Sequence, residues 1–361
     1  MIVVAPRVLT PEGFVDDAAV VIEGGRIAAV EPAGPADVVL DEGLLAPGLI
    51  DLQVNGAFGV DFATSLDWGA AARRLPETGV TSFLPTLVSA PIDDLVRGLR
   101  TPLRSAGARM LGVHVEGPFL TRAGAHDPAC LCDPTPERLD ALLEPGTMAL
   151  LTLAPERPGA LAAIGRAAAA GVVVSIGHSE ATAEVVTAAA DAGARMVTHL
   201  FNALGPGIAS RALSDQRLFC GLIADGHHVS NAAVAAAFTD APGRIALVSD
   251  GIEATGMPPG RYRLGRVPVT VEPGMPPVRD DGTLAGSVLR LDAAVAHAVA
   301  AGADPAAAIY AASRVPADVL QREDLGRIAP GARADLVWLG PGFEAGATWV
   351  GGEPVYGIAL R

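Results

Sequence analysis

Short apolar segments alternate with alanine-rich segments along most of the chain. Eight apolar runs follow one another in the order LIDLQVNG (49–56), TSFLPTLVS (81–89), MLGVHVEG (110–117), MALLTLAP (148–155), VVVSIGH (172–178), RMVTHLF (195–201), GLIADG (221–226) and IALVSDG (245–251). Continuous apolar runs of this kind are typical of parallel strands that are buried on both faces. Helical patterns lie between them, at 67–78, 91–106, 136–144, 158–170, 180–193 and 229–240. The alternation predicts an α/β fold, a closed (β/α)8 TIM-like barrel.

A doubly wound open sheet is the alternative interpretation of the same alternation. Such a sheet often carries a glycine-rich GxGxxG turn directly after its first strand, where it binds a dinucleotide. No such turn follows LIDLQVNG, and two further helices are expected at 287–302 and 304–321. We therefore expect the barrel.

The two ends of the chain have a different pattern. Residues 1–41 form short alternating runs with a hairpin signal at Gly24-Gly25, and the tail returns to short apolar runs. We expect a small β-sandwich domain built from residues 1–45 and 326–361, beside a barrel at 46–325. A Gly/Pro-rich stretch at about 256–283 predicts an insertion with its own hairpin.

The charge of the chain limits the possible partners. The 361 residues carry a formal net charge of −14 with no basic run, so we expect neither nucleic acid nor a membrane as a partner. All 26 residues counted as Lys+Arg are arginines. A lysine Schiff base and a carbamylated lysine are therefore excluded.

The cysteines indicate a reducing compartment. There are three, Cys130, Cys132 and Cys220, too few for a disulfide framework. The N-terminal residues lack the features of a signal peptide, so we expect a cytoplasmic protein. The CxC at Cys130 and Cys132 is a weak metal motif, and ordinary thiols are the simpler interpretation.

Two histidines end neighbouring apolar runs at matching positions. His178 follows VVVSI and His199 lies in MVTHLF, and the interval of 21 positions from one to the other suffices for one strand, one helix and the turns between them. Parallel neighbouring strands would bring both imidazoles to the same edge of the barrel, as half of a metal site. The alternative is that each is a lone polar residue at the end of a strand.

Other polar residues fall at the same edge. The strand ends carry, in chain order, Gln53, Asn55, Glu116, His178, His199, Asn202, Asp225, His228 and Asp250. One carboxylate and two imidazoles match a His2Glu zinc site with an open position for water. Asp250 ends the eighth run, where it could take a proton from that water and return it to a leaving amine.

The motifs HVEGPFL, SIGHSEAT, THLFNA, GLIADGHHV, LVSDG and LAGS, in this order, resemble those of the amidohydrolase superfamily. Within it they resemble the N-acetylglucosamine-6-phosphate deacetylase family. By position, the resemblance implies that Glu116, His178 and His199 bind the metal and that Asp250 is the catalytic acid–base. It implies that the residues facing the substrate are His126, Asn202, Ala203, Arg211 and His228. His126 would also help the metal to polarise the acetyl carbonyl.

The resemblance also bears on the number of metal ions. Many amidohydrolases carry HxH on the first strand for a second metal, but here this position reads Gln53-Val54-Asn55. Amide side chains are poor ligands for transition metals, so we expect one divalent ion per chain. Zinc suits the site best, with iron, manganese or cobalt as alternatives. We expect Gln53, Asn55 and His114 to support the ligands from behind.

A phosphate group would need positive partners in this acidic chain. The resemblance implies a homodimer in which an arginine after THLFNA reaches the phosphate, often in the partner's site. Arg211 occupies this loop, but the family's usual Arg-Glu-Pro is absent, so Arg217 is an alternative. The planar fork of an arginine can bind phosphate through two parallel hydrogen bonds.

The activity implied by the resemblance is metal-dependent hydrolysis of the acetamide of N-acetyl-D-glucosamine 6-phosphate, which yields acetate and D-glucosamine 6-phosphate. One alternative is deacylation of another N-acyl amino sugar, such as N-acetylgalactosamine 6-phosphate. Another is a catalytically silent barrel that binds a sugar phosphate. Asp250 argues against the silent barrel, because binding alone does not require a base that faces the metal.

Overall fold

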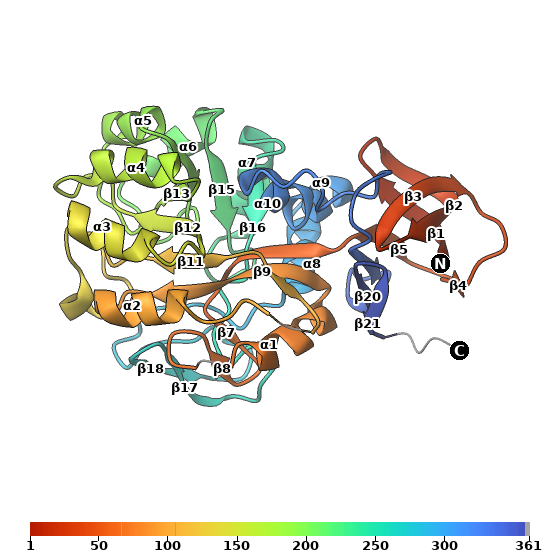
Figure 1. Ribbon diagram of the computed structural model, residues 1–361, viewed down its shortest axis with the longest axis horizontal. Coiled ribbons are helices and arrows are strands. Elements are labelled where there is room, and N and C mark those ends of the chain that lie inside the picture. The colour runs from red at the N-terminus through yellow and green to blue at the C-terminus, as the bar shows by residue number, and fades with distance from the viewer. Residues whose placement is uncertain (66, 105, 358–361) are drawn as a thin grey trace.

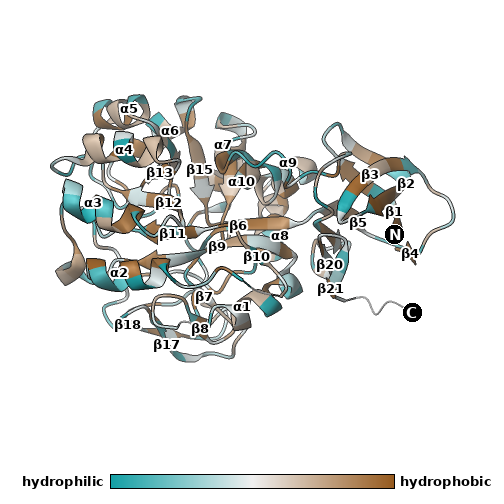
Figure 2. Ribbon diagram, viewed as in Figure 1, coloured by the Kyte–Doolittle hydropathy of each residue, from teal (hydrophilic) through white to brown (hydrophobic). Residues whose placement is uncertain are grey.

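The structure is a computed structural model that describes residues 1–65, 67–104 and 106–357. Figure 1 shows a barrel with helices around it and, to its right, a small β domain that contains the N-terminus and the last strands. Figure 2 shows mainly hydrophobic residues along the barrel strands and a mixture of hydrophobic and hydrophilic residues on the outer helices. Among the described residues, no helix has the length and apolar character needed to cross a bilayer.

Eight parallel strands within the described residues form the barrel, which confirms the predicted fold. They are β6 (Leu49–Val54), β9 (Val80–Val88), β11 (Val113–Glu116), β12 (Met148–Leu153), β13 (Val173–Ile176), β14 (Ala194–Val197), β15 (Phe219–Leu222) and β16 (Ile245–Leu247). Neighbours pair in this order, and a short strand β10 (Arg109–Met110) also pairs with β9. A parallel bridge between Val54 and Gly251 joins β16 to β6 and closes the ring.

Most of the predicted helices are present. The helices are α1 (Gly69–Arg74), α2 (Ile92–Leu99), α3 (Pro136–Leu143), α4 (Ala160–Ala169), α5 (Ala183–Asp191), α6 (Ile208–Ser214), α7 (Asn231–Asp240), α8 (Leu291–Ala300), α9 (Pro305–Ala311) and α10 (Arg314–Val319), with 3-10 turns at Leu75–Thr78 and Pro128–Cys130. Side-chain caps start several of them: Ser230 accepts a hydrogen bond from Ala233 N, and Asp304 from Ala307 N.

Two predictions about helices were wrong. The single helix expected at 304–321 is divided into α9 and α10, with the break at Ala312 and Ser313. The segment after THLFNA, which we expected to be a loop, contains α6. This seven-residue helix directly follows Gly205-Pro206-Gly207, a sequence that is typical of turns.

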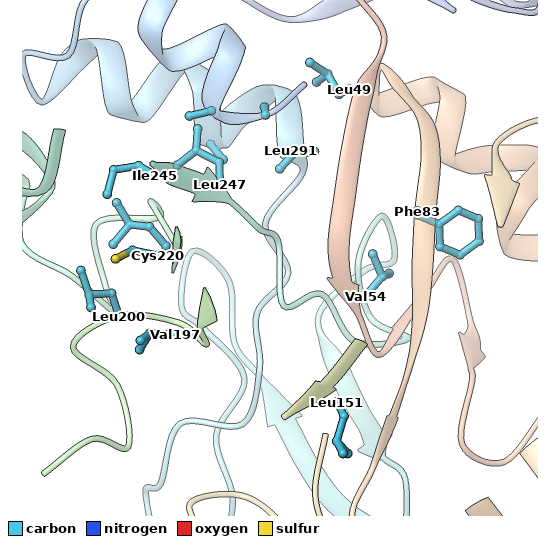
Figure 3. Close-up of a cluster of buried hydrophobic side chains, with 14 of the residues drawn as sticks. Leu49, Val54, Phe83, Leu151, Val197, Leu200, Cys220, Ile245, Leu247 and Leu291 are labelled. Carbon is cyan, nitrogen blue, oxygen red and sulfur yellow. The ribbon is translucent and has the colours of Figure 1, made fainter. Parts of the chain in front are cut away.

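The apolar core has two layers around the barrel wall. One layer lies between strands and helices, and Figure 3 shows part of it, including Val197, Cys220 and Leu247. The other fills the barrel, where Ile50, Leu84, Leu150, Met196 and Val248 pack with residues of α10. Because α10 belongs to this inner cluster, it closes the end of the barrel that holds the strand N-termini.

Both ends of the chain contribute to the small domain. Its sheet contains β1 (Ile2–Thr10), β2 (Gly13–Glu23), β3 (Arg26–Pro32), β4 (Val38–Val39), β5 (Leu44–Pro47), β19 (Leu336–Leu339), β20 (Ala345–Val350) and β21 (Glu353–Tyr356). Antiparallel pairing of β5 with β19, at Ala46 and Val337, joins the two ends. The division of the chain at about residues 45 and 325 stays a prediction.

A hairpin lies beside the mouth of the barrel. Its strands are β17 (Gly260–Leu264) and β18 (Val267–Val271), and Leu264 and Val269 pack against Val88 and Ala125. The carboxylate of Asp61 accepts a hydrogen bond from Gly265 N at 2.7 Å. Asp61 belongs to the small ribbon formed by β7 (Gly56–Ala57) and β8 (Val60–Asp61). The hairpin is thereby fixed to the barrel end that carries the candidate site.

Candidate metal centre and active site

Most of the polar residues predicted at the strand ends line one cavity of about 710 Å³ at the barrel mouth, but Gln53 and Asp225 are not lining residues. Glu116 is the last residue of β11, His178 lies two residues beyond β13, and His199 lies two beyond β14. These three and Asp250 are at most 8% exposed. Of the other expected residues, Asn55, His126, Asn202, Ala203 and His228 also line the cavity.

Glu116, His178 and His199 form a group whose ligand atoms lie within 4.8 Å of one another. The Nε2 atoms of the two histidines are 3.1 Å apart. Each is also close to Glu116 Oε1, at 3.3 Å for His178 and 3.1 Å for His199. Two imidazoles and a carboxylate at this spacing are a suitable donor set for a divalent metal ion.

The backbone determines which nitrogen of each histidine faces this group. His178 Nδ1 lies 2.9 Å from the carbonyl oxygen of Arg122, and His199 Nδ1 lies 3.2 Å from that of Asn202. A carbonyl oxygen only accepts, so each Nδ1 carries the proton. Both Nε2 lone pairs then face each other and the carboxylate. Three acceptors this close repel one another unless a cation lies between them, so the residues fit a metal.

Backbone strain is concentrated at this cavity. His178, His199 and Asp250 have φ values of 49°, 28° and 51°, and Phe201 and Ala203 have φ values of 76° and 51°. Such conformations are costly for residues other than glycine and cluster at functional sites. They turn the side chains of the strand ends into the cavity.

Asp250 lines the same cavity and contacts Gln53 of β6 and Asn55, the residue after β6. Its Oδ1 accepts a hydrogen bond from Gln53 Nε2 at 3.0 Å and from Asn55 Nδ2 at 2.7 Å. Burial, followed by the negative charge of Glu116, raises the pKa of Asp250 to about 6. A carboxyl group with a pKa in this range can both accept and return a proton near neutral pH.

His126 presents a proton to the cavity. The backbone N–H of Ser89 donates to His126 Nδ1 at 3.1 Å, so the proton of the neutral ring is on Nε2. Nε2 lies 3.7 Å from Glu116 Oε2. Burial lowers the pKa of His126 to about 3. The ring is therefore a neutral donor, suited to a carbonyl oxygen or an oxyanion.

His228 and His114 occupy different depths. His228 lines the cavity, and its Nδ1 lies 2.7 Å from Asp225 Oδ2. His114 is not among the lining residues and is 1% exposed. Its Nε2 lies 2.8 Å from the hydroxyl of Thr152, and burial lowers its pKa to about 4. His114 is thus a neutral residue of a polar layer beneath the cavity.

The two arginines expected at the phosphate lie outside the cavity of their own chain. Arg211, on α6, pairs with Asp215 at 3.0 Å, and Arg217 pairs with Asp215 and Asp191 at 2.8 and 2.5 Å. Neither is a lining residue. A role in the site of a partner subunit stays a prediction for Arg211.

Arg122 is a lining residue that the sequence reasoning missed. Its Nη1 donates to Leu204 O at 2.7 Å, and its Nε lies 2.9 Å from Glu180 Oε1 at the rim. The only signal in the sequence is its position four residues before His126. Because Leu204 follows Asn202 and Ala203, this guanidinium lies beside two of the expected substrate residues.

The CxC motif lies apart from the metal group. Cys130 and Cys132 are half-buried and absent from the cavity lining. Burial raises the pKa of both thiols. This agrees with ordinary protonated thiols, as the sequence favoured.

Comparison with known proteins identifies the family. The model of the amidohydrolase family matches residues 44–355. The chain belongs to the amidohydrolase family. Amidohydrolases depend on metal, and Glu116, His178 and His199 are the candidate site in this member.

Two relatives resemble this amidohydrolase over nearly its whole length. N-acetylgalactosamine-6-phosphate deacetylase of Escherichia coli O157:H7 is 39% identical, covering 92% of this chain and 93% of its own. N-acetylglucosamine-6-phosphate deacetylase of Bos taurus is 38% identical, covering 93% and 91%. The likeness therefore includes both the barrel and the small domain.

Solved structures agree. A variant N-acetyl-D-glucosamine-6-phosphate deacetylase from Mycobacterium smegmatis, in complex with N-acetyl-D-glucosamine-6-phosphate, has a TM-score of 0.93 at 34% identity. It covers 98% of this chain and 99% of its own. N-acetylglucosamine-6-phosphate deacetylase from Thermotoga maritima has a TM-score of 0.90 at 31% identity, with 99% of each chain covered.

Proposed function

We propose that this amidohydrolase removes the acetyl group of N-acetyl-D-glucosamine 6-phosphate, which yields D-glucosamine 6-phosphate and acetate. The observation that carries the proposal is the position of Asp250 beside the Glu116–His178–His199 group in one cavity. The relatives and the solved structures named above are deacetylases of acetylated amino-sugar phosphates, which supports the choice of substrate class.

The reaction needs a nucleophile, a polarised carbonyl and a protonated leaving nitrogen. A divalent metal ion held by Glu116, His178 and His199 supplies the Lewis acidity, and we propose zinc as this ion. His126 Nε2–H donates a hydrogen bond to the carbonyl oxygen as negative charge develops on it. Asp250 takes a proton from the attacking water and delivers it to the nitrogen as the C–N bond breaks.

We propose that Arg122 binds the 6-phosphate from within the same chain. The protein carries a net charge of −14 and has no lysine, so the dianion requires an arginine, a histidine or backbone N–H groups. Among the described residues that line the cavity, Arg122 is the only arginine, and His228 is on the same lining. A phosphate near Leu204 would compete with Glu180 for this guanidinium.

We further propose a homodimer in the cytoplasm, in which Arg211 could supplement Arg122 from the partner subunit. On α6, Arg211 is 34% exposed although it pairs with Asp215. Size-exclusion chromatography with light scattering tests the dimer. If the protein is a monomer at assay concentration, Arg211 has no place in the site.

The test of the function is acetate release from a panel of N-acetyl amino sugars, with and without the 6-phosphate, by protein of measured metal content. N-acetylgalactosamine 6-phosphate is the second candidate, because the E. coli relative carries the name of that deacetylase. Higher kcat/KM for this epimer would change the proposed substrate. Tight binding of both sugars with no acetate release would favour the silent barrel.

A further inference from the structure

One buried amide lies between the two carboxylates of the site. Gln53 Nε2 donates to Glu116 Oε1 at 3.1 Å and to Asp250 Oδ1 at 3.0 Å, and the residue is 2% exposed. A primary amide has two N–H groups, so one is available for each carboxylate. Two buried carboxylates repel each other, and a shared pair of donors offsets this repulsion while fixing their separation.

A second amide binds only one of these carboxylates. Asn55 Nδ2 donates to Asp250 Oδ1 at 2.7 Å. Within the described residues, both hydrogen bonds that the Asp250 carboxylate accepts from these amides end on Oδ1. The rotation of the carboxylate is therefore fixed, and Oδ2 remains as the oxygen that can exchange a proton.

The backbone holds both amides rigidly. Gln53 lies in β6 and Asn55 is the residue after it, and both side chains reach Asp250 Oδ1. Asp250 N donates to Gln53 O at 2.9 Å, and Asn55 N donates to Gly251 O at 2.8 Å. The donors and the carboxylate thus belong to the strand ends that close the barrel, which is a suitable frame for precise placement of a reacting group.

We propose that Gln53 and Asn55 are positioning residues that make Oδ2 of Asp250 the proton-transferring oxygen. Gln53 has a second task, because it also fixes the carboxylate of Glu116 for the metal. Asn55 has no such task, since its side chain contacts Asp250 and not Glu116. The positioning of Asp250 for proton transfer rests on the proposed function. The orientation of Glu116 by Gln53 does not depend on which substrate the protein uses.

The difference between the two contacts gives the test. Gln53→Met removes both N–H donors and keeps a side chain of similar volume. We expect about a tenfold or larger loss of zinc affinity in the metal-free protein, measured by competition with a chelating dye, as for other partners of metal ligands. We also expect kcat of the zinc-saturated variant to fall by about 10- to 100-fold at nearly unchanged KM, the scale of lost hydrogen bonds to a charged group.

Asn55→Leu removes only the contact with Asp250. We expect a loss of kcat comparable to that of Gln53→Met. The zinc affinity should stay within about threefold of wild type, because Asn55 does not contact a metal ligand. Thr81→Val is the matched control, because Thr81 donates to Leu49 O at 3.2 Å between β9 and β6, far from the site. This variant should lower the melting temperature and leave kcat and zinc affinity unchanged.

Several results would overturn the inference. Wild-type kcat in zinc-saturated Gln53→Met would remove the positioning role. Equal losses of zinc affinity in Gln53→Met and Asn55→Leu would indicate general loosening of the strand ends instead. If the wild-type protein released no acetate from any sugar, the proposed function would fail, but the zinc titrations would still decide whether Gln53 orients Glu116.

Discussion

At the scale of single residues, the site depends on side chains that the backbone orients. The carbonyl oxygens of Arg122 and Asn202 hold the Nδ1 protons of His178 and His199, so both Nε2 atoms are available to a metal. His126 is held in the opposite tautomer by Ser89 N. Three imidazoles in one cavity thus present two different groups to it, lone pairs from His178 and His199 and an N–H from His126, because of the hydrogen bond on the far side of each ring.

Asp250→Asn tests the acid–base residue. The asparagine keeps the shape and the hydrogen-bonding oxygen but cannot accept the water proton, so kcat should fall by about 10² or more while metal content and KM change little. His178→Ala or His199→Ala should instead lose the metal, as measured by elemental analysis. Near wild-type turnover by Asp250→Asn would show that another group is the base.

Arg122→Ala tests the proposed phosphate contact. Loss of a charge-assisted hydrogen bond of roughly 1.5–3 kcal/mol should raise KM for N-acetylglucosamine 6-phosphate about tenfold or more. KM for unphosphorylated N-acetylglucosamine should barely change. Arg211→Ala is the parallel variant. If it alone shows this selective loss, the phosphate is held by the partner subunit, and equal losses on both sugars would indicate a structural role.

The sequence predicted that Glu116, His178, His199 and Asp250 lie together because all four follow one positional rule. Each lies at or just beyond the carboxyl end of an apolar run, and in a parallel barrel these ends share one rim. No such rule predicts that Arg122 reaches the cavity. It lies in an irregular segment between β11 and α3, where the path of the backbone decides which side chains reach the cavity.

At the scale of elements, the strands were easier to predict than the helices. Buried parallel strands must be apolar on both faces, so their runs are continuous and unambiguous. The alanine-rich segments show weaker periodicity. The signal for the break at Ser313 is Pro316, which has no N–H to bond the carbonyl of Ala312 in a continuous helix, and the prediction of one helix did not take it into account. α6 was missed because a seven-residue helix is too short for a reliable period and follows a turn signal.

The junction of β6 and β16 contains a buried acid that makes stability depend on pH. Asp51 is 1% exposed and accepts hydrogen bonds from Gln53 N and Ser249 N at 3.2 Å. Burial raises its pKa to about 7. Between about pH 4 and pH 7, the folded protein retains a proton that the unfolded chain has released. The contribution of Asp51 to stability therefore declines as the pH rises through this window.

Asp51→Asn should remove this decline, because asparagine resembles the protonated acid. Thermal unfolding should show similar melting temperatures for the two proteins near pH 4.5. At pH 8 the variant should have the higher melting temperature, because the wild-type carboxyl group is then ionised in its buried position. A variant that is less stable at pH 8 would mean that the surrounding N–H donors already stabilise the ionised carboxylate.

At the scale of the whole molecule, the barrel holds the candidate metal group, Glu116, His178 and His199, at one of its two ends. The barrel is filled by apolar residues at the end closed by α10 and is polar at the opposite end. The hairpin at 260–271 lies beside that polar end. It is held there by the hydrogen bond from Gly265 N to Asp61 and by the apolar contacts of Leu264 and Val269. Binding of a metal here should therefore stabilise the whole fold, since the ligands come from three separate strand ends.

We expect one tightly bound divalent metal per chain. Among the described residues, the group with metal-ligating geometry is Glu116, His178 and His199. The neighbouring position on β6 holds Gln53 and Asn55, whose N–H groups point at the carboxylates and would oppose a second cation. Elemental analysis of protein purified without added metal should give about one equivalent.

Removal of the metal by a chelator should abolish activity and lower the melting temperature, because a ligand that binds only the folded state stabilises it. One equivalent of zinc should restore both properties. If full activity required two equivalents, the amide pair would not exclude a second ion, and the single-metal site would have to be abandoned.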